Sequence, residues 1–463
     1  MNTFTLLGSL RNPVFARLYA AQTTSLLGDA LTWVGLALLA FELAGKTSAV
    51  VLSGALTLRV TAFVLLSPLA GAFADRFDRK LIMVITHLAR MLIVSLLPFV
   101  TAVWQIYVLI FALNVFNAFF TPTYKATIPL VTGQNDYPQA IALSSATYQL
   151  LAVLGPGLAG AIAAFIGARQ VFFLDALTFV IAAILIFTLP GQLSVEPSQQ
   201  PSKTVGRTWQ DIKEGTTRLI TDAPIRYALA MQLVASIVGA QILVNTVGYV
   251  KGTLQLGNVQ YGWVMAAFGI GATLSAVAFG AINRRLALTT FALIGATVIT
   301  VALLPASYSG LALLMVLWAF AGAGQNLVDL PTQTLIAARI PAAVQGRVYG
   351  AHFAWSHLWW AISYPLAGWL GSHFAEHEFL YGSLIGLMLL VIVQLTLKPQ
   401  PHDHEHMHYL TWHEHSHVHD EHHQHDHYQE IPEGEPHSHP HEHMTIISHS
   451  HPHRSDLHHR HHH

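Results

Sequence analysis

The sequence predicts an all-α membrane protein with twelve transmembrane helices in two pseudo-symmetric six-helix halves, followed by a disordered, histidine-rich C-terminal tail. Three observations predict this fold class. The 463 residues are 53% hydrophobic and 10% charged, whereas a soluble domain carries about 25% charged residues. Apolar segments of membrane-spanning length recur along the chain. The two parts of the chain that contain these segments repeat each other at a fixed offset.

Each transmembrane helix needs about 20 mainly apolar residues, because lipid offers the backbone no hydrogen-bond partner outside a helix. The predicted spans are residues 15–41, 47–73, 80–103, 105–131, 138–166, 170–190, 225–250, 259–282, 286–305, 309–337, 345–371 and 377–398. Residues 207–221 place apolar side chains on one helical face and predict a surface helix at the inner leaflet. The predicted domains are an N-terminal six-helix half at 1–190, a cytoplasmic linker at 191–224, a C-terminal six-helix half at 225–398 and a cytoplasmic tail at 399–463.

The basic residues of the predicted loops lie mainly on one side of the membrane. With the N-terminus in the cytoplasm, the outer loops hold only three of them, Lys46, Arg169 and Lys251. This bias is the positive-inside pattern, and it predicts a multi-pass protein of the cell inner (plasma) membrane. An even number of spans then places the C-terminus in the cytoplasm together with the N-terminus.

The two halves share residues with backbone roles at an offset of 209 positions. At this offset Asn117 aligns with Asn326, and Pro122-Thr123 aligns with Pro331-Thr332. Parallel repeats of this kind are common in secondary transporters, whose substrate sites lie at mid-membrane between the halves. We therefore expect the site to lie between the two halves.

The segment between the second and third spans carries a charged loop motif. It reads Gly71-Ala-Phe-Ala-Asp75-Arg76-Phe-Asp78-Arg79-Lys80. A carboxylate at the membrane edge can pair with arginines in one conformation and release them in another. The segment resembles the G-x-x-x-D-R-x-G-R-K/R loop of the major facilitator superfamily, with an aspartate at the usual second glycine. The resemblance implies the fold of that superfamily and a gating role for Gly71, Asp75, Arg76 and Arg79.

A second motif, Gly155-Pro156-Gly157-Leu-Ala-Gly160, lies in the fifth span. Small residues allow close helix packing, and a proline adds a bend. The motif is similar to the G-P-x-x-G-G stretch of the superfamily's antiporters, with an alanine at one expected glycine. The similarity implies an exporter in which Gly155 and Pro156 take part in the conformational change.

Ionisable side chains inside the spans are candidates for transport chemistry, because a charge at mid-bilayer costs roughly 2.5–3.5 kcal/mol on insertion scales. At about 1.5 Å per residue, Asp29, Arg90, Asp329 and His357 lie roughly 15–18 Å from the inner surface. We expect Asp29 to pair with Arg90, either to fix helix packing or to serve gating and proton transfer. We expect Asp329 to meet His357 and to bind substrate or protons.

The other candidates inside the predicted spans are Arg59, His87, Asp175 and His352. His352 lies about 140° around its helix from His357, so one helix face cannot present both. We expect His87 and His352 to be structural histidines, each satisfied within the helix bundle.

Histidine dominates the tail, where residues 402–463 hold 24 of the 29 histidines, interleaved with Asp, Glu, Ser and Pro. Neutral imidazole is a common ligand of borderline divalent metals, so we expect the tail to bind Ni²⁺, Co²⁺ or Zn²⁺. The chain has no cysteine, which disfavours Cu(I) as cargo. The predicted metal ligands are His402, His404, His406, His408, His413, His415, His417, His419, His422, His423, His425, His427, His437, His439, His441 and His443.

The whole chain resembles the histidine-tailed nickel-resistance permeases of the NreB/NrsD type, which belong to the same superfamily. This resemblance implies proton-coupled efflux of a divalent transition metal, Ni²⁺ first and Co²⁺ second, and hence metal resistance. The body alone also looks like exporters of drugs and siderophores. The alternative function is therefore export of an organic solute, such as a drug, macrolide or siderophore, with a metal-storing tail. A further alternative is a metal-sensing membrane protein with little transport.

The sequence contains no Gly-x-x-x-x-Gly-Lys-Ser/Thr motif and no nucleophile constellation. We therefore expect a secondary transporter rather than an enzyme, driven by protons rather than directly by ATP. No tightly bound cofactor is expected, since the metal ion is substrate and tail ligand. The expected partners are a divalent metal ion, protons and the lipid bilayer, without nucleic acid, and the expected oligomeric state is a monomer.

Overall fold

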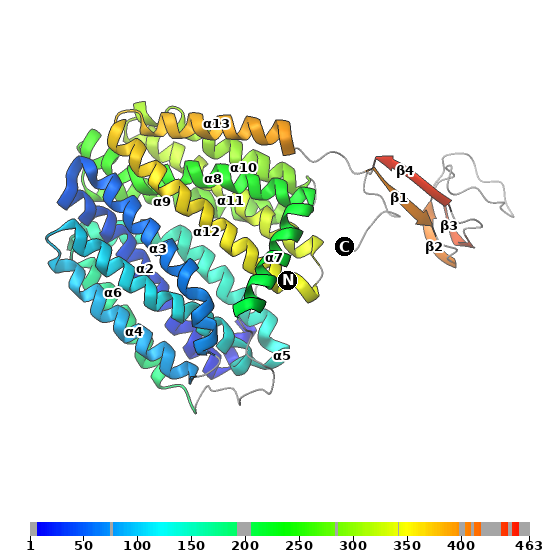
Figure 1. Ribbon diagram of the computed structural model, residues 1–463, viewed down its shortest axis with the longest axis horizontal. Coiled ribbons are helices and arrows are strands. Elements are labelled where there is room, and N and C mark those ends of the chain that lie inside the picture. The colour runs from blue at the N-terminus through cyan, green and yellow to red at the C-terminus, as the bar shows by residue number, and fades with distance from the viewer. Residues whose placement is uncertain are drawn as a thin grey trace. The chain divides into compact units, whose positions relative to one another are not determined.

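The structure is a computed structural model that describes residues 7–74, 77–191, 205–282, 286–340 and 342–397, and the tail segments 403–408, 412–417, 437–442 and 447–452. Residues 1–398 and 399–463 form two separate compact units. The first unit is helical throughout its described part (Figure 1). Its α-helices are α2 (Pro13–Ala44), α3 (Ser48–Ala74), α4 (Arg79–Leu96), α5 (Val103–Ile166), α6 (Val171–Phe187), α7 (Val205–Thr221), α8 (Ala223–Gly248), α9 (Asn258–Ile282), α10 (Leu288–Leu303), α11 (Leu311–Arg339), α12 (Ala342–His373) and α13 (Glu378–Leu397).

Each span predicted from the sequence falls on one of these helices. The fourth and fifth spans form the two arms of α5, which meet at Gly133 with a φ of 70° and a ψ of 175°, a conformation that glycine adopts readily. Within the described residues, eight segments are long and apolar enough to cross a membrane. Large apolar side chains such as Phe165 and Leu395 are exposed, as expected for helices that face lipid.

Side-chain caps define where α2 and α4 begin. Asn12 accepts hydrogen bonds from two backbone N–H groups in the first turn of α2, a common way to satisfy the unpaired donors of a helix start. Asp78 accepts a hydrogen bond from the backbone N–H of Lys80 at 2.9 Å. The aspartate that replaces a glycine in the loop motif therefore acts as the N-cap of α4.

The aligned Pro-Thr steps have the same local geometry in both halves. In α5 the hydroxyl of Thr123 donates to the carbonyl oxygen of Phe119 at 2.7 Å. In α11 the hydroxyl of Thr332 donates to the carbonyl oxygen of Val328, also at 2.7 Å. Such bonds to the carbonyl four residues earlier often accompany helix bending. The repeat seen in the sequence thus extends to matching hydrogen bonds.

The two halves contact each other through α5 with α9 and through α3 with α12. In the first contact, a Cβ on Gly160 of α5 would overlap the Cα of Gly262 in α9. In the second contact, Gly368 of α12 lies directly against the side chain of Ser53 in α3. The absence of a side chain on these glycines allows the backbones to approach closely.

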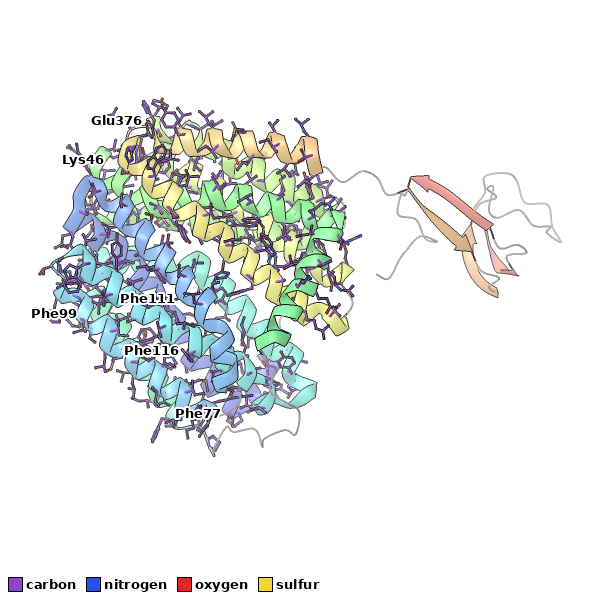
Figure 2. All side chains as sticks on the ribbon, viewed as in Figure 1. Lys46, Phe77, Phe99, Phe111, Phe116 and Glu376 are labelled. Carbon is purple, nitrogen blue, oxygen red and sulfur yellow. The ribbon has the colours of Figure 1, made fainter. Side chains whose placement is uncertain are left out.

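These contacts lie toward one end of the membrane helices, which we name the outer end after the charge bias of the loops. Figure 2 labels Lys46, Phe99 and Glu376 at this end and Phe77 at the opposite, inner end. In Figure 1, α3 and α12 lie side by side at the outer end and diverge toward the inner end, where α7 lies. The halves are therefore closed against each other at their outer ends.

The linker helix α7 packs against α12 and α8 of the C-terminal half. Trp355 of α12 donates its indole N–H to the hydroxyl of Thr216 at 3.2 Å. Arg347, also in α12, donates to the carboxylate of Glu214 at 2.6 Å. The surface helix predicted at 207–221 is present, and the structure attaches it to the C-terminal half.

The tail differs from the disordered coil predicted from its composition. Its described segments are strands β1 (Asp403–His408), β2 (Trp412–His417), β3 (His437–Glu442) and β4 (Ile447–Pro452). β1 pairs with β4, and β2 pairs with β3, both antiparallel. Histidine alternates with other residues in these segments, and a period of two is typical of a strand. The disordered coil was predicted from the composition of the tail, whereas this alternation is typical of strands.

Candidate transport site

A buried arginine connects the polar side chains inside the N-terminal half. Arg90 of α4 donates to Oδ1 of Asn117 in α5 at 2.9 Å and to Nδ1 of His87 at 2.8 Å. Its guanidinium also lies over the rings of Phe120 and Phe179, at 4.6 and 4.5 Å from their centroids. Arg90 is 1% exposed, so its charge is compensated by protein groups rather than by water.

Two aspartates, Asp29 of α2 and Asp175 of α6, lie within electrostatic range of Arg90. Asp175 is fully buried and accepts hydrogen bonds from the hydroxyls of Thr32 and Thr178. Asp29 is only partly buried, and its carboxylate accepts no hydrogen bond from any of the described residues. The pair expected between Asp29 and Arg90 is thus part of a triad, in which Asp175 is the enclosed counter-ion and Asp29 has no hydrogen-bond donor within the described part of the chain.

In the C-terminal half, two amides hold the carboxylate of Asp329 in α11. Its Oδ1 accepts from Nε2 of Gln232 in α8, and its Oδ2 accepts from Nε2 of Gln325, each at 3.0 Å. The other amide atom of Gln232, Oε1, lies 2.9 Å from Nε2 of His352 in α12. His352, expected to be an isolated structural histidine, is therefore linked to Asp329 through one glutamine.

The expected contact between Asp329 and His357 does not occur among the hydrogen bonds and ring contacts of the described residues. Nδ1 of His357 lies 2.8 Å from the carbonyl oxygen of Phe353. Its ring centroid lies 6.3 Å from that of Phe63 in α3 of the other half. The physical reason is the helix rotation of about 140° between positions 352 and 357. Because His352 faces the Asp329 network, His357 faces the N-terminal half.

Two cationic side chains of the N-terminal half lie within electrostatic range of His357: Arg59 of α3 and Lys125 of α5. The guanidinium of Arg59 lies 4.5 Å from the centroid of the Trp33 ring. Lys125 makes no hydrogen bond or ion pair with any of the described residues. The region between the halves thus combines cationic groups with aromatic rings, at the depth where the sequence analysis placed the site.

The loop motif is only partly described. Asp75 and Arg76 lie outside the described residues, and for Gly71 only the helical backbone of α3 is described. Arg79 donates to the carbonyl oxygen of Ala126 at 2.7 Å and so connects the start of α4 to α5. The gating role of these motif residues stays a prediction.

The glycine motif of α5 contacts both halves. A Cβ on Gly155 would lie 2.7 Å from the Cβ of Ala30 in α2, within the N-terminal half. A Cβ on Gly157 would lie 2.6 Å from the Cβ of Ala266 in α9, across the interface. The helix continues through Pro156. The motif therefore forms part of the surface on which the halves meet, and the gating role of Gly155 and Pro156 stays a prediction.

The tail register places histidine opposite histidine. Within the described residues, no group of three or more His, Asp or Glu side chains could hold a metal ion. The Cα partners are His404 with His451, His406 with His449, His413 with His441, His415 with His439 and His417 with His437, whereas His408 faces Ile447. The predicted ligands outside the described residues are His402, His419, His422, His423, His425, His427 and His443. Metal binding by the tail stays a prediction.

Sequence reasoning did not single out three residues that belong to this site, Lys125, Gln232 and Thr32. Lys125 is a charged residue inside the predicted span 105–131, so the criterion that selected Arg59 would also have selected it. Gln232 and Thr32 carry no comparable signal, because amides and hydroxyls are frequent in membrane helices, where they join neighbouring helices.

Comparison with known proteins covers most of the chain. Residues 4–425 match the family model MFS_3, described as transmembrane secretion effector. The chain is 30% identical over 352 residues to the uncharacterized MFS-type transporter YfiS of Bacillus subtilis. The aligned residues cover 72% of this chain and 81% of YfiS.

Two further relatives are named as efflux proteins. The chain is 24% identical to the multidrug efflux pump Tap of Mycolicibacterium fortuitum, over 83% of this chain and 95% of Tap. It is 28% identical to macrolide efflux protein A of Streptococcus pyogenes, over 37% of this chain and 43% of that protein. The crystal structure of the nucleoside transporter NupG aligns with a TM-score of 0.65 at 13% identity, over 84% of this chain and 100% of NupG, which shows a shared fold. The chain therefore belongs to the transmembrane secretion effector family of the major facilitator superfamily and is a membrane transporter rather than an enzyme.

Proposed function

We propose that this protein exports a partly apolar organic solute across the cell inner membrane. The observation that carries the proposal is the group of side chains between the halves, where Arg59 and Lys125 lie within electrostatic range of His357 and the rings of Trp33 and Phe63 lie beside them. Sites for organic ligands are lined by aromatic side chains with a few placed polar groups. The positive charges of Arg59 and Lys125 would repel a divalent metal ion in this region. An organic solute therefore fits this region better than the nickel ion suggested by the tail.

The direction of transport is proposed from two features. The glycine motif of α5 is similar to a motif of antiporters, and it lies at the contact between the halves. Two relatives, Tap and macrolide efflux protein A, are named for efflux. Both features support export rather than uptake.

We further propose that twelve helical spans place both termini in the cytoplasm, as the basic residues predict. The contact at the outer ends then corresponds to an inward-facing state, in which the cytosol reaches the region between the halves. A solute would enter from the cytosol in this state and leave after the outer contact opens.

Proton coupling is proposed to act through Asp29. Its carboxylate accepts no hydrogen bond among the described residues, and it lies within electrostatic range of both Arg59 and Arg90. A carboxylate inside the membrane is a default candidate for a proton relay. Asp175, in contrast, is fully buried and held by two hydroxyls, which favours a structural role for it.

The test is an efflux assay in a bacterial host that lacks its own drug exporters. The host expresses the chain or its Asp329→Asn variant and grows on graded erythromycin, the dye N-phenyl-1-naphthylamine, and nickel, cobalt and zinc salts. We expect the unaltered chain to protect against at least one organic compound and the variant to protect less. Protection against the metal salts alone would refute the proposal.

Export of a divalent metal, with the tail as collector, is a second candidate function. The specific observation in its favour is the register of the tail strands, which sets five histidine pairs opposite each other. The discriminating measurement is uptake of radioactive nickel into inside-out vesicles with a proton gradient, for the full chain and for a chain that lacks residues 402–463. Proton-dependent nickel uptake would support this candidate, and nickel bound equally without a gradient would leave the tail only a storage role.

A further inference from the structure

We propose that Lys125 and Arg59 form an anion subsite opposite His357, so that the exported solute carries an acidic group beside its apolar part. The inference rests on the proposed export of an organic solute and deepens it by naming the chemical class. An acidic group here means a carboxylate, sulfonate or phosphate, all of which form charge-assisted hydrogen bonds with ammonium and guanidinium groups.

The first argument is the position of Lys125. It lies in the first arm of α5, which ends at Gly133, so at about 1.5 Å per residue it lies roughly 12 Å from that turn. Its ammonium group is close enough to His357 of α12 for an electrostatic interaction. Lys125 is exposed, and its electrostatic interaction with His357, whose ring contacts Phe63 of α3, favours the side of α5 that faces the other half.

The second argument is the balance of charge around this position. Arg90 lies within electrostatic range of Asp175 and Asp29, and Arg59 lies within range of Asp29. Lys125 has no carboxylate partner among the described residues. A cation without a partner at membrane depth is costly and is by default a functional group. The charge that is missing is one negative charge next to Lys125 and Arg59.

The carboxylate of the C-terminal half does not supply that charge. Asp329 is held by Gln232 and Gln325 through both of its oxygens. Among the described residues, no hydrogen bond, ion pair or electrostatic interaction joins Asp329 to Lys125 or Arg59. The position is therefore open to the acidic group of a ligand.

The third argument is the aromatic surface beside the two cations. Arg59 stacks on Trp33 at 4.5 Å, which holds the guanidinium in place. On the other half, the ring of Phe353 lies 3.8 Å from that of His357 and is 40% exposed. An exposed ring next to a cation that is held in place suits a ligand that is apolar at one end and anionic at the other.

The experiment compares two dyes with one scaffold. 8-Anilinonaphthalene-1-sulfonate carries one sulfonate, whereas N-phenyl-1-naphthylamine is the same scaffold without it. Proton-driven accumulation of each dye is measured in inside-out vesicles that contain the full chain, Lys125→Gln, Arg59→Gln, Lys125→Arg, or the control Lys46→Gln in an outer loop. The amount of each protein in the membrane is measured by immunoblot.

We expect the full chain to accumulate the sulfonate with a KM about tenfold lower than that of the neutral dye, as one charge-assisted contact supplies. Lys125→Gln and Arg59→Gln should abolish this preference, measured as the ratio of the two KM values per amount of protein. Lys125→Arg should keep the preference, and Lys46→Gln should behave as the full chain.

Other results would overturn the inference in two distinguishable ways. Transport of the neutral dye without an advantage for the sulfonate, or a preference that survives Lys125→Gln, would refute the anion subsite and leave organic export intact. Transport of neither dye by the full chain would refute both the subsite and the proposed function.

Discussion

Arg339, the last residue of α11, donates its Nε–H to Oδ2 of Asp222 at 2.7 Å, while Oδ1 of the same carboxylate accepts from the backbone N–H of Ile225 at 3.0 Å. Asp222 follows α7 directly and is the N-cap of α8. One carboxylate thus joins the linker helix, the first span of the C-terminal half and the end of α11. The side chains of Arg339 and Asp222 are 32% and 19% exposed, so water screens this pair only in part.

Asp222→Ala should destabilise the protein more than Asp222→Asn. Alanine removes both the cap and the ion pair, for a loss of about 1–2 kcal/mol, whereas asparagine still caps a helix and loses only the charge, for less than about 1 kcal/mol. The measurement is thermal unfolding in detergent. Equal midpoints for the two variants would show that the cap contributes nothing.

Gly160→Leu should open the contact between the halves at their outer ends, because the new side chain would occupy the space of Gly262. The chain has no cysteine, so Ser53→Cys introduces a single thiol at a position that is 5% exposed and packed on α12. We expect a maleimide to label this thiol faster in the Gly160→Leu background.

The matched control for that experiment is Gly350→Leu in α12, where a Cβ would meet nothing within 4 Å. It should leave the labelling rate of Ser53→Cys unchanged. The same acceleration in both backgrounds would mean that the effect reflects general loosening rather than the contact of α5 with α9.

Asp329→Asn should reduce export by about tenfold, measured as dye efflux per amount of protein. An asparagine offers one acceptor and one amide group, so Gln232 or Gln325 loses its acceptor. An unsatisfied buried donor costs about 1–3 kcal/mol, which corresponds to about tenfold in a rate. His352→Ala leaves both hydrogen bonds of Asp329 in place and should reduce export less. Equal export rates for Asp329→Asn and His352→Ala would contradict a role of the Asp329 carboxylate in export.

Asp175→Asn should impair folding, whereas Asp29→Asn should impair proton coupling. Removing a charge from a buried ion network costs about 3–5 kcal/mol, so Asp175→Asn should lower the amount of folded protein, measured by size-exclusion chromatography of a fluorescent fusion. Asp29→Asn should fold normally and lose proton-driven transport, measured by a pH-sensitive dye in vesicles. Normal proton coupling in Asp29→Asn would remove this residue from the mechanism.

The sequence predicted the helices well, because the bilayer imposes both their length and their composition. The arms of α5 and the surface helix α7 are examples, since the apolar length of spans 105–131 and 138–166 and the amphipathic face of 207–221 are properties of the sequence itself. The strands of the tail were not predicted, because high charge and histidine content are typical of a disordered segment. The strand signal is the alternation of histidine with other residues.

The partners of the intramembrane side chains could be predicted only in part. The sequence gives the angle between His352 and His357, about 140°, but not the rotation of α12 against its neighbours. That rotation is set by packing, and it directs His352 rather than His357 toward the Asp329 network. Likewise, Arg90 was recognised as a buried cation, whereas the hydroxyl donors of Asp175 depend on the packing of α2 against α6.

The meeting of Gly160 and Gly262 has a mechanical consequence. Two α-carbons in contact present no rotatable side-chain bond, so the halves can roll over each other at this point without changing a rotamer or breaking a side-chain hydrogen bond there. The energy barrier to alternation would then arise elsewhere, in the polar contacts that open and close around this pivot.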